Sequence, residues 1–561
     1  MSTSASVRPP AAAPAWPSTT GLVVRQTRHD LVGIRRTPVV LFFALAFPVG
    51  FFILLASVIG NETIDSRSGI RYAQFLAPAF AAFGIAMATF AFLAIGLAEI
   101  RFNGVLRRLS GTPLPAWVLL AGRVLAGTVL AFGSVLLLVA VGMAFYDVQM
   151  VWRTLPAVIV TVLVAAMSFS ALGLAVAAWA PSMQAATALA NGIVITLAFI
   201  SDLFIVGTLP GWLDTLGWVF PLKHLVNALG DEFNPMLDGS GFYPGHLAVI
   251  AAWGVAGAVL AWWGVRRAAT GAGGGAADLG TAPASASGRS ARSATRDGTP
   301  RHTGRVPVGG LVLDQVRHAN SGIWRDWSAV FFGVGFPLLL AVLLTTVFGG
   351  KEAETDEGVR LGQLFAATMT MYGAAVISYV TLPEGLAEMR QAGVLRRWSG
   401  TPLPSWALLA GRAVSAVWVA LVAMALVYAA MVPVFGVVIP PTWIVGVAIL
   451  VVSTLSFAAL GMAVVSLVRS TQAVLAVCLG SLITLAFFSD IFIIGAPFPD
   501  LLNTVSWILP LRPAVNSLVD AMAADAAFPA LNPGWMATVI AWGIAGVVVT
   551  MLRSRASRGT D

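Results

Sequence analysis

Long apolar segments, separated by short polar or basic stretches, recur along the whole chain. About 20 apolar residues cross the hydrocarbon core of a bilayer, and runs of that length predict an all-α integral membrane protein with twelve membrane-spanning helices. We place six in each half of the chain, at residues 38–60, 73–98, 117–145, 154–178, 184–207 and 244–265, and then at 327–349, 362–386, 406–434, 442–466, 472–496 and 533–552.

The two halves of the chain repeat each other. Residues 104–123 read GVLRRLSGTPLPAWVLLAGR and residues 393–412 read GVLRRWSGTPLPSWALLAGR, which agree at 17 of 20 positions with an offset of 289. Other landmarks return at an offset of 289 or 288, which indicates a duplicated unit with small changes in its loops. Because six is an even number, each repeat begins and ends on the same side, so we predict two parallel repeats.

The segments between and around the repeats have a different composition. Residues 266–308 are rich in Gly, Ala, Ser, Thr and Arg and cannot bury a core, so we expect a disordered cytoplasmic linker. The predicted organisation is a disordered cytoplasmic N-terminus (1–20), a first six-span repeat (21–265), the linker (266–308), a second six-span repeat (309–553) and a cytoplasmic tail (554–561).

Charge is scarce and unevenly distributed. Hydrophobic residues make up 58% of the chain and charged residues 10%, with a net charge of +8. If the N-terminus is inside, 26 of the 33 Lys and Arg residues lie inside, so the positive-inside rule predicts cytoplasmic N- and C-termini. Scattered basic loops favour membrane lipids as partners and argue against a nucleic acid. Arg outnumbers Lys 31 to 2, which indicates a bacterial source and a bacterial plasma membrane.

The duplicated segment follows the second span of each repeat and is basic. In the first copy, Val105, Leu106 and Leu109 can share one side of a short helix while the arginines face away, as in a helix at a membrane surface. Thr112 and Pro113 then predict the N-cap and first position of the next helix. An ordinary positive-inside loop that anchors the protein to the membrane surface is one interpretation of this pattern.

The whole pattern resembles the permease subunits of type 2 ATP-binding-cassette exporters, the class that includes daunorubicin-resistance-type drug permeases. The resemblance covers almost all of both repeats, although members of that family usually have six spans and pair as dimers. It implies that the duplicated segments are coupling loops that dock onto ATPase subunits. The candidate coupling residues are Glu99, Arg101, Gly104, Arg107, Arg108, Thr112, Pro113, Glu388, Arg390, Gly393, Arg396, Arg397, Thr401 and Pro402.

No nucleotide-binding motif accompanies these loops. A P-loop requires G-x-x-x-x-G-K-[ST], and the only two lysines, Lys223 and Lys351, lie in no such motif. We therefore expect no catalytic residues and no bound cofactor in this chain, with ATP and Mg held by two separate ATPase subunits. The five histidines have no metal-ligand spacing and Cys478 is alone, so we expect no metal site.

An acidic residue recurs late in the fifth predicted span of each repeat. The candidate residues for a substrate pathway or outer gate are Ser201, Asp202, Phe204, Ser489, Asp490 and Phe492. A carboxylate at the bilayer centre is costly, and a position near the outer interface without a role in transport is the alternative interpretation.

These observations predict the permease subunit of an ATP-driven exporter, which would carry a small hydrophobic or amphipathic substrate such as a drug, an antibiotic or a lipid. A secondary transporter driven by ion gradients would also show parallel six-span repeats, but it would more often carry ionisable residues deep within its spans. A membrane scaffold or sensor without transport activity is a third possibility.

Overall fold

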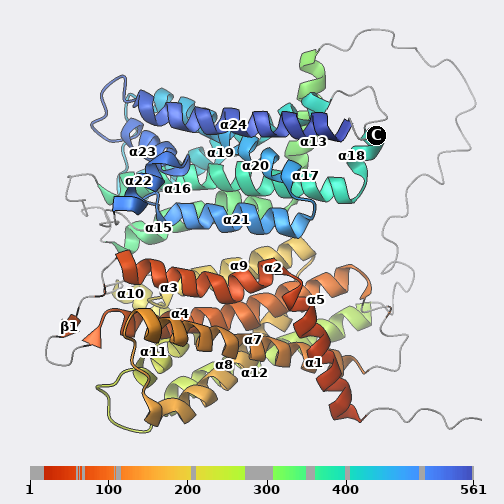
Figure 1. Ribbon diagram of the computed structural model, residues 1–561, viewed down its shortest axis with the longest axis vertical. Coiled ribbons are helices and arrows are strands. Elements are labelled where there is room, and N and C mark those ends of the chain that lie inside the picture. The colour runs from red at the N-terminus through yellow and green to blue at the C-terminus, as the bar shows by residue number, and fades with distance from the viewer. Residues whose placement is uncertain are drawn as a thin grey trace, which may run out of the picture.

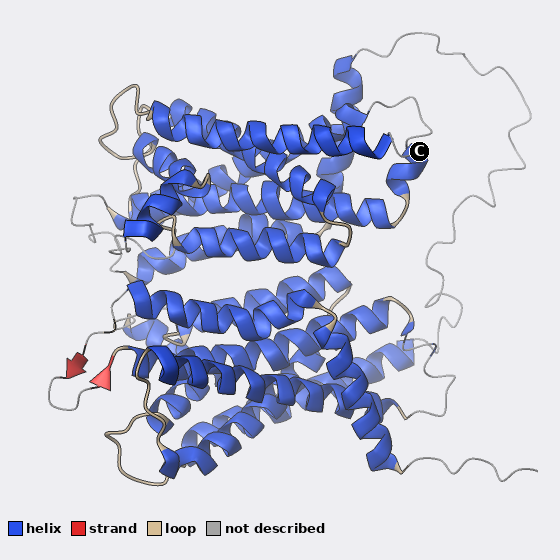
Figure 2. Ribbon diagram, in the orientation of Figure 1, coloured by secondary structure: helices blue, strands red, loops and turns tan. Residues whose placement is uncertain are grey.

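The computed structural model describes residues 18–58, 61, 63–65, 70–105, 108, 115–203, 210–271, 308–348, 360–398, 405–491 and 500–558. These residues are almost entirely helical, as Figure 2 shows. A short antiparallel hairpin, in which Thr63 pairs with Arg71, lies between the first two spans. The prediction of an all-α membrane protein is confirmed.

The first half of the chain begins with an amphipathic helix and ends with a long apolar one. Its elements are α1 (Thr19–Arg35), α2 (Pro38–Leu41), η1 (Phe42–Ala46), α3 (Phe47–Val58), β1 (Thr63–Asp65), β2 (Ile70–Arg71), α4 (Ala73–Ala86), η2 (Met87–Ala91), α5 (Phe92–Phe102), α7 (Ala116–Phe145), η3 (Trp152–Thr154), α8 (Leu155–Trp179), α9 (Met183–Ile200), α10 (Gly211–Gly217), α11 (Pro221–Glu232) and α12 (Pro244–Gly271).

The second half repeats this order of helices. Its elements are α13 (Val308–Arg325), α14 (Trp327–Val330), η4 (Phe331–Gly335), α15 (Phe336–Val347), α16 (Leu361–Ala375), η5 (Val376–Thr381), α17 (Leu382–Gln391), α18 (Val394–Trp398), α19 (Ser405–Phe435), α20 (Trp443–Leu467), α21 (Thr471–Phe487), α22 (Asp500–Ile508), α23 (Leu511–Ala521) and α24 (Pro533–Arg558). The segments η1, η2, η4 and η5 are π-helical and continuous with their neighbouring α-helices.

Twelve apolar helices account for the twelve predicted spans. Among the described residues, ten helices are long and apolar enough to cross a membrane, and two shorter apolar helices, Phe42–Ser57 and Thr471–Phe487, stand at the remaining predicted positions. In Figure 1 the two halves form neighbouring bundles, and the long axes of most of their helices are roughly aligned. Helices α1 and α13 lie at one end of the bundles, and α10, α11, α22 and α23 lie at the other. We call these the inner and outer ends.

Several helix boundaries differ from the prediction. The fifth span of each repeat ends early, at Ile200 and Phe487, because the chain leaves the helix just before Asp202 and Asp490. Both aspartates adopt a left-handed backbone conformation, with φ of 59° and 57°, which ends an α-helix. At the other boundary, α12 continues to Gly271, inside the predicted linker. The linker residues 272–307 lie outside the described residues.

The two halves meet through matching contacts between a phenylalanine and a glycine. A methyl group built on Gly192 would lie 2.5 Å from the Phe331 ring, and one built on Gly480 would lie 3.3 Å from the Phe42 ring. Both phenylalanines begin π-helical segments of the first span, and both glycines lie on the fifth span of the opposite half. The glycines therefore let each ring approach the facing backbone closely.

Candidate functional site

At the inner end, a glycine stops the second span of each repeat. Gly104 and Gly393 have φ of 69° and 68°, the left-handed conformation that commonly closes a helix. Their amides donate to the carbonyls of Arg101 and Arg390 at 3.3 and 3.1 Å. A new helical turn follows at once, and in the second repeat it forms α18. The predicted short helix after span two is confirmed there.

Arg101 and Arg390 face the bundle and cap a neighbouring helix. Arg101 Nη1 donates to Ala177 O at 2.8 Å, at the end of α8. Arg390 Nη1 donates to Val465 O at 2.6 Å, near the end of α20. Cations are favourable at helix C-termini, where carbonyls lack partners. These two arginines therefore fix the end of span two to the end of span four.

The last glycine of the duplicated segment packs under the amphipathic helix of its repeat. A methyl group built on Gly122 would lie 2.5 Å from Gln26 Cγ, and one built on Gly411 would lie 2.4 Å from Gln315 Cβ. Helices α1 and α13 therefore cross α7 and α19 at positions that accept only a glycine without rearrangement. This contact explains part of the similarity between the two copies without any partner protein.

The arginine after each of these glycines reaches back to the second span. Arg123 Nη1 would lie 2.7 Å from a methyl group on Gly96, and Arg412 Nη1 would lie 3.1 Å from one on Gly385. Arg412 also donates to the sulfur of Met389 at 2.8 Å. Spans two and three of each repeat are thereby in contact on the side of the inner loop.

Other candidate coupling residues face solvent or lie outside the described part of the chain. Glu99, Arg108, Glu388 and Arg397 are exposed at the inner end. Arg107, Thr112, Pro113, Thr401 and Pro402 lie outside the described residues, as does the side chain of Arg396. The predicted helix start at Thr112 and Pro113 is wrong, since α7 begins at Ala116 with Pro115 as its N-cap. Pro115 has an extended backbone, with ψ of 135°, so the helix starts after this proline.

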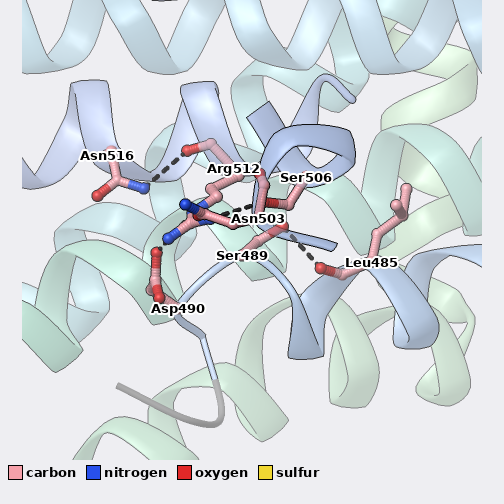
Figure 3. A network of polar contacts seen from close by, with 7 residues as sticks. All are labelled: Leu485, Ser489, Asp490, Asn503, Ser506, Arg512 and Asn516. Carbon is pink, nitrogen blue, oxygen red and sulfur yellow. Dashed lines mark hydrogen bonds and ion pairs between the residues drawn. The ribbon is translucent and has the colours of Figure 1, made fainter. Parts of the chain in front are cut away.

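At the outer end of the second repeat, Arg512 ties three segments together (Figure 3). Its Nε donates to Asp490 Oδ2 at 2.9 Å, and its Nη1 donates to Asn503 Oδ1 and to Ser506 Oγ, each at 2.6 Å. The guanidinium carbon lies 4.6 Å from the centre of the Trp507 ring. The planar guanidinium suits several fixed acceptors at once, so it joins the end of α21 to α22 and α23.

The first repeat builds the same network with a lysine. Lys223 is 1% exposed, and its Nζ lies 3.0 Å from Asp202 Oδ2 and also donates to Asp214 Oδ1. It lies 5.3 Å from the centre of the Trp218 ring. The hydrogen bond from Lys223 holds the pKa of Asp214 below its ordinary value. The ammonium is thus buried with two carboxylates and an aromatic face as its partners.

The apolar pattern of the sequence singled out the two aspartates but not Lys223 and Arg512, the cations they bind. Lys223 and Arg512 are 289 residues apart, as are Asp214 and Asn503, so the repeat offset itself could have identified these partners. Ser489 is buried and donates to Leu485 O at 2.6 Å, and Ser201 is buried at the equivalent position. Phe204 and Phe492 lie outside the described residues. Among the described contacts, each aspartate pairs with a cation of its own repeat.

A buried carboxyl group lies on the same helix as Lys223. Glu232, at the end of α11, is 1% exposed, and Thr161 donates to its Oε1 at 2.5 Å. Burial raises the pKa of Glu232 to about 8. The second repeat has Ala521 at the equivalent position, so this group is a property of the first half alone.

A comparison with protein families identifies the repeated unit. The family model described as "ABC-2 type transporter" matches residues 23–231 and again residues 316–523, which together are most of the chain. A search of curated proteins finds no match. Within the described residues, no group of three or more His, Cys, Asp or Glu side chains could hold a metal ion. The chain is a multi-pass membrane protein that belongs to the ABC-2 type transporter family and carries two copies of its membrane unit.

Proposed function

We propose that this chain alone forms the complete membrane pore of an ATP-driven exporter and binds two separate ATPase subunits at its inner loops. The observation that carries the proposal is the pair of duplicated inner loops, which lie at the same end of two matched family units. Each loop presents exposed charges, Glu99 and Arg108 in one repeat and Glu388 and Arg397 in the other. Two equivalent surfaces suit two copies of one partner. The ATPase subunits, with ATP and Mg, supply the chemistry.

The contacts around each loop suggest how movement would pass into the membrane. Gly104 and Gly393 turn the chain at the end of span two, and Arg101 and Arg390 fix that end to span four. Arg123 and Arg412 connect span three to span two. A force applied to the loop by a closing ATPase would therefore displace spans two, three and four together, and the halves would alternate between inward- and outward-facing states.

We place the protein in a bacterial plasma membrane, with both termini in the cytoplasm. This orientation puts the basic inner loops beside cytoplasmic ATPases and agrees with the positive-inside rule. The proposed substrates are hydrophobic or amphipathic compounds such as drugs, antibiotics or lipids. The networks around Asp202 and Asp490 would then hold the outer segments against span five and open or close the outer exit.

Charge reversal at the inner loops tests the docking role. The test variant combines Arg107→Glu, Arg108→Glu, Arg396→Glu and Arg397→Glu, which makes the loops acidic. A partner surface that complements the native basic loops is then repelled, because like charges across an interface cost several kcal/mol. The tagged chain, purified from its native host, is expected to lose its co-purifying ATPase and the associated ATP hydrolysis. Its amount in the membrane should remain unchanged.

The control reverses two arginines that are also exposed, inner and repeat-related. Arg28→Glu with Arg317→Glu lies on α1 and α13 and should leave the ATPase bound. Normal ATP hydrolysis in the loop variant contradicts the docking role. Transport that needs an ion gradient and no ATPase would instead establish a secondary transporter.

A further inference from the structure

A cavity of about 490 Å³ lies beside the fifth span of the second repeat. Helices α20, α21 and α24 line it, together with Tyr379 of η5 and with Phe42 from the opposite half. Its outer end lies at Leu511, next to the Arg512 network. Two of its lining residues, Val477 and Thr484, are exposed on α21. The cavity therefore opens within the spanning part of the bundle, and its volume is typical of a small-molecule site.

The polar side chains in this cavity find hydrogen-bond acceptors within the protein. When Ser481 Oγ donates to Val477 O at 2.6 Å, the hydrogen bond of 3.0 Å between Ser481 and Tyr379 uses the tyrosine proton. Thr484 Oγ1 donates to Gly480 O at 2.8 Å.

Trp542 also lines the cavity, and its Nε1 donates to Ile508 O at 2.8 Å. The hydroxyl oxygens of Tyr379 and Thr484 still carry free lone pairs. In this arrangement the described side chains of the cavity accept a hydrogen bond from a ligand.

The first repeat does not offer the same groups. By the repeat offsets, Phe90 stands where the second repeat has Tyr379, and Ile193 stands where it has Ser481. Thr196 and Trp253 match Thr484 and Trp542. The paired hydroxyls are thus specific to the second half of an otherwise duplicated protein.

We propose that this cavity binds an apolar molecule with one hydrogen-bond donor, such as a long-chain alcohol, through the hydroxyl oxygen of Tyr379. The exposure of its lining at span depth and its apolar walls suit a ligand that arrives through the bilayer. The role of this ligand as an exported substrate rests on the proposed function, whereas its binding does not. The site makes the two halves functionally unequal.

Photolabelling of the purified full-length chain in phosphatidylcholine nanodiscs tests the site. The probes are hexadecanol carrying a diazirine, its methyl ether, and a phosphatidylcholine carrying the same diazirine. Mass spectrometry then measures the labelling of residues 471–487. Since a hydrogen bond contributes about 1 kcal/mol, labelling by the alcohol should exceed labelling by the ether about fivefold.

The variant Tyr379→Phe provides the matched change, because it keeps the ring and reproduces the residue of the first repeat. It should lower alcohol labelling to the level of the ether and leave ether labelling unchanged. Equal labelling by alcohol and ether, or alcohol labelling that survives in Tyr379→Phe, overturns the proposal. If the phospholipid probe labels residues 471–487 and excess hexadecanol does not reduce that labelling, the cavity is a site for lipid chains. This result also overturns the proposal. None of these readouts requires an ATPase or transport.

Discussion

At the scale of single residues, the charges of the outer segments are paired in a repeat-specific way. Lys223 has two carboxylates, Asp202 and Asp214, among its described partners, whereas those described for Arg512 are the carboxylate of Asp490, an amide and a hydroxyl. Removing one partner of a buried ion pair leaves an uncompensated charge, which is costly. The two networks should therefore respond differently to the same substitution.

Substituting the two aspartates separately tests this difference. Asp490→Asn removes the carboxylate that lies 2.9 Å from Arg512 Nε, where both side chains are largely buried, and we expect a loss approaching about 3–5 kcal/mol, as for a broken buried pair. Asp202→Asn leaves Asp214 on Lys223, so we expect about 1 kcal/mol or less. Thermal unfolding of both variants in detergent measures the difference. Equal losses of stability in the two variants would show that Asp214 does not compensate for Asp202. Separately, unchanged export by the double variant Asp202→Asn with Asp490→Asn would exclude an outer gate.

Glu232 makes the stability of the first half depend on pH. Its pKa rises from 4.5 to about 8 on folding, so the folded protein retains a proton that the unfolded chain releases between these values. The contribution of the neutral carboxyl is complete below 4.5 and is lost as pH rises through 8.

The variant Glu232→Gln is neutral at every pH and provides the comparison. Between pH 6 and 9, the melting temperature of the native chain should fall relative to that of the variant. Parallel melting curves over this range would contradict the assignment of a neutral Glu232 in the folded protein.

At the scale of elements, glycines set the closest contacts between helices. A methyl group built on Gly257 of α12 would lie 2.7 Å from the backbone nitrogen of Leu172 on α8. One built on Gly546 of α24 would lie 2.6 Å from the backbone of Ala459 on α20. Small residues permit such approach between membrane helices, so the fourth and sixth spans pack the same way in both repeats.

Gly257→Ala is expected to destabilise the chain by about 1–3 kcal/mol, because the added methyl group meets backbone that cannot rotate away. The control is Gly133→Ala on α7, where a methyl group has nothing within 4 Å and should be neutral or stabilising. Chemical unfolding of the two variants in the same detergent compares them. A Gly257→Ala variant as stable as the control would refute the close contact.

Most elements could be predicted from the apolar pattern, because a span needs a minimum apolar length. The errors lie at boundaries set by single residues, such as Pro115 before α7 and the left-handed Asp202 after α9. The candidate site could be predicted only in part. Asp202 and Asp490 stood out as charges in apolar surroundings, whereas Lys223 and Arg512 resembled ordinary loop charges until the fold brought them to the aspartates.

At the scale of the whole molecule, the duplication places two matched units beside each other. Phe51 and Phe487, from opposite halves, have ring centres 3.8 Å apart, and Phe487 lies in the hydrophobic core of the first half. Each half therefore contributes residues to the hydrophobic core of the other, such as Phe487 to the first and Phe199 to the second. Glu232 and the Tyr379 hydroxyl, each present in a single repeat, show that the two units have diverged within this common frame.

The sequence by itself determined that this is a membrane protein of two parallel repeats with a duplicated inner loop, because apolar length and repeat offset are properties of the chain. Only the tertiary structure decided which residues meet across it. The pairing of Asp490 with Arg512, the capping of α20 by Arg390 and the cavity at Tyr379 join residues that lie 22 to about a hundred positions apart. Such contacts depend on how the helices pack, and periodicity along the chain does not encode that packing.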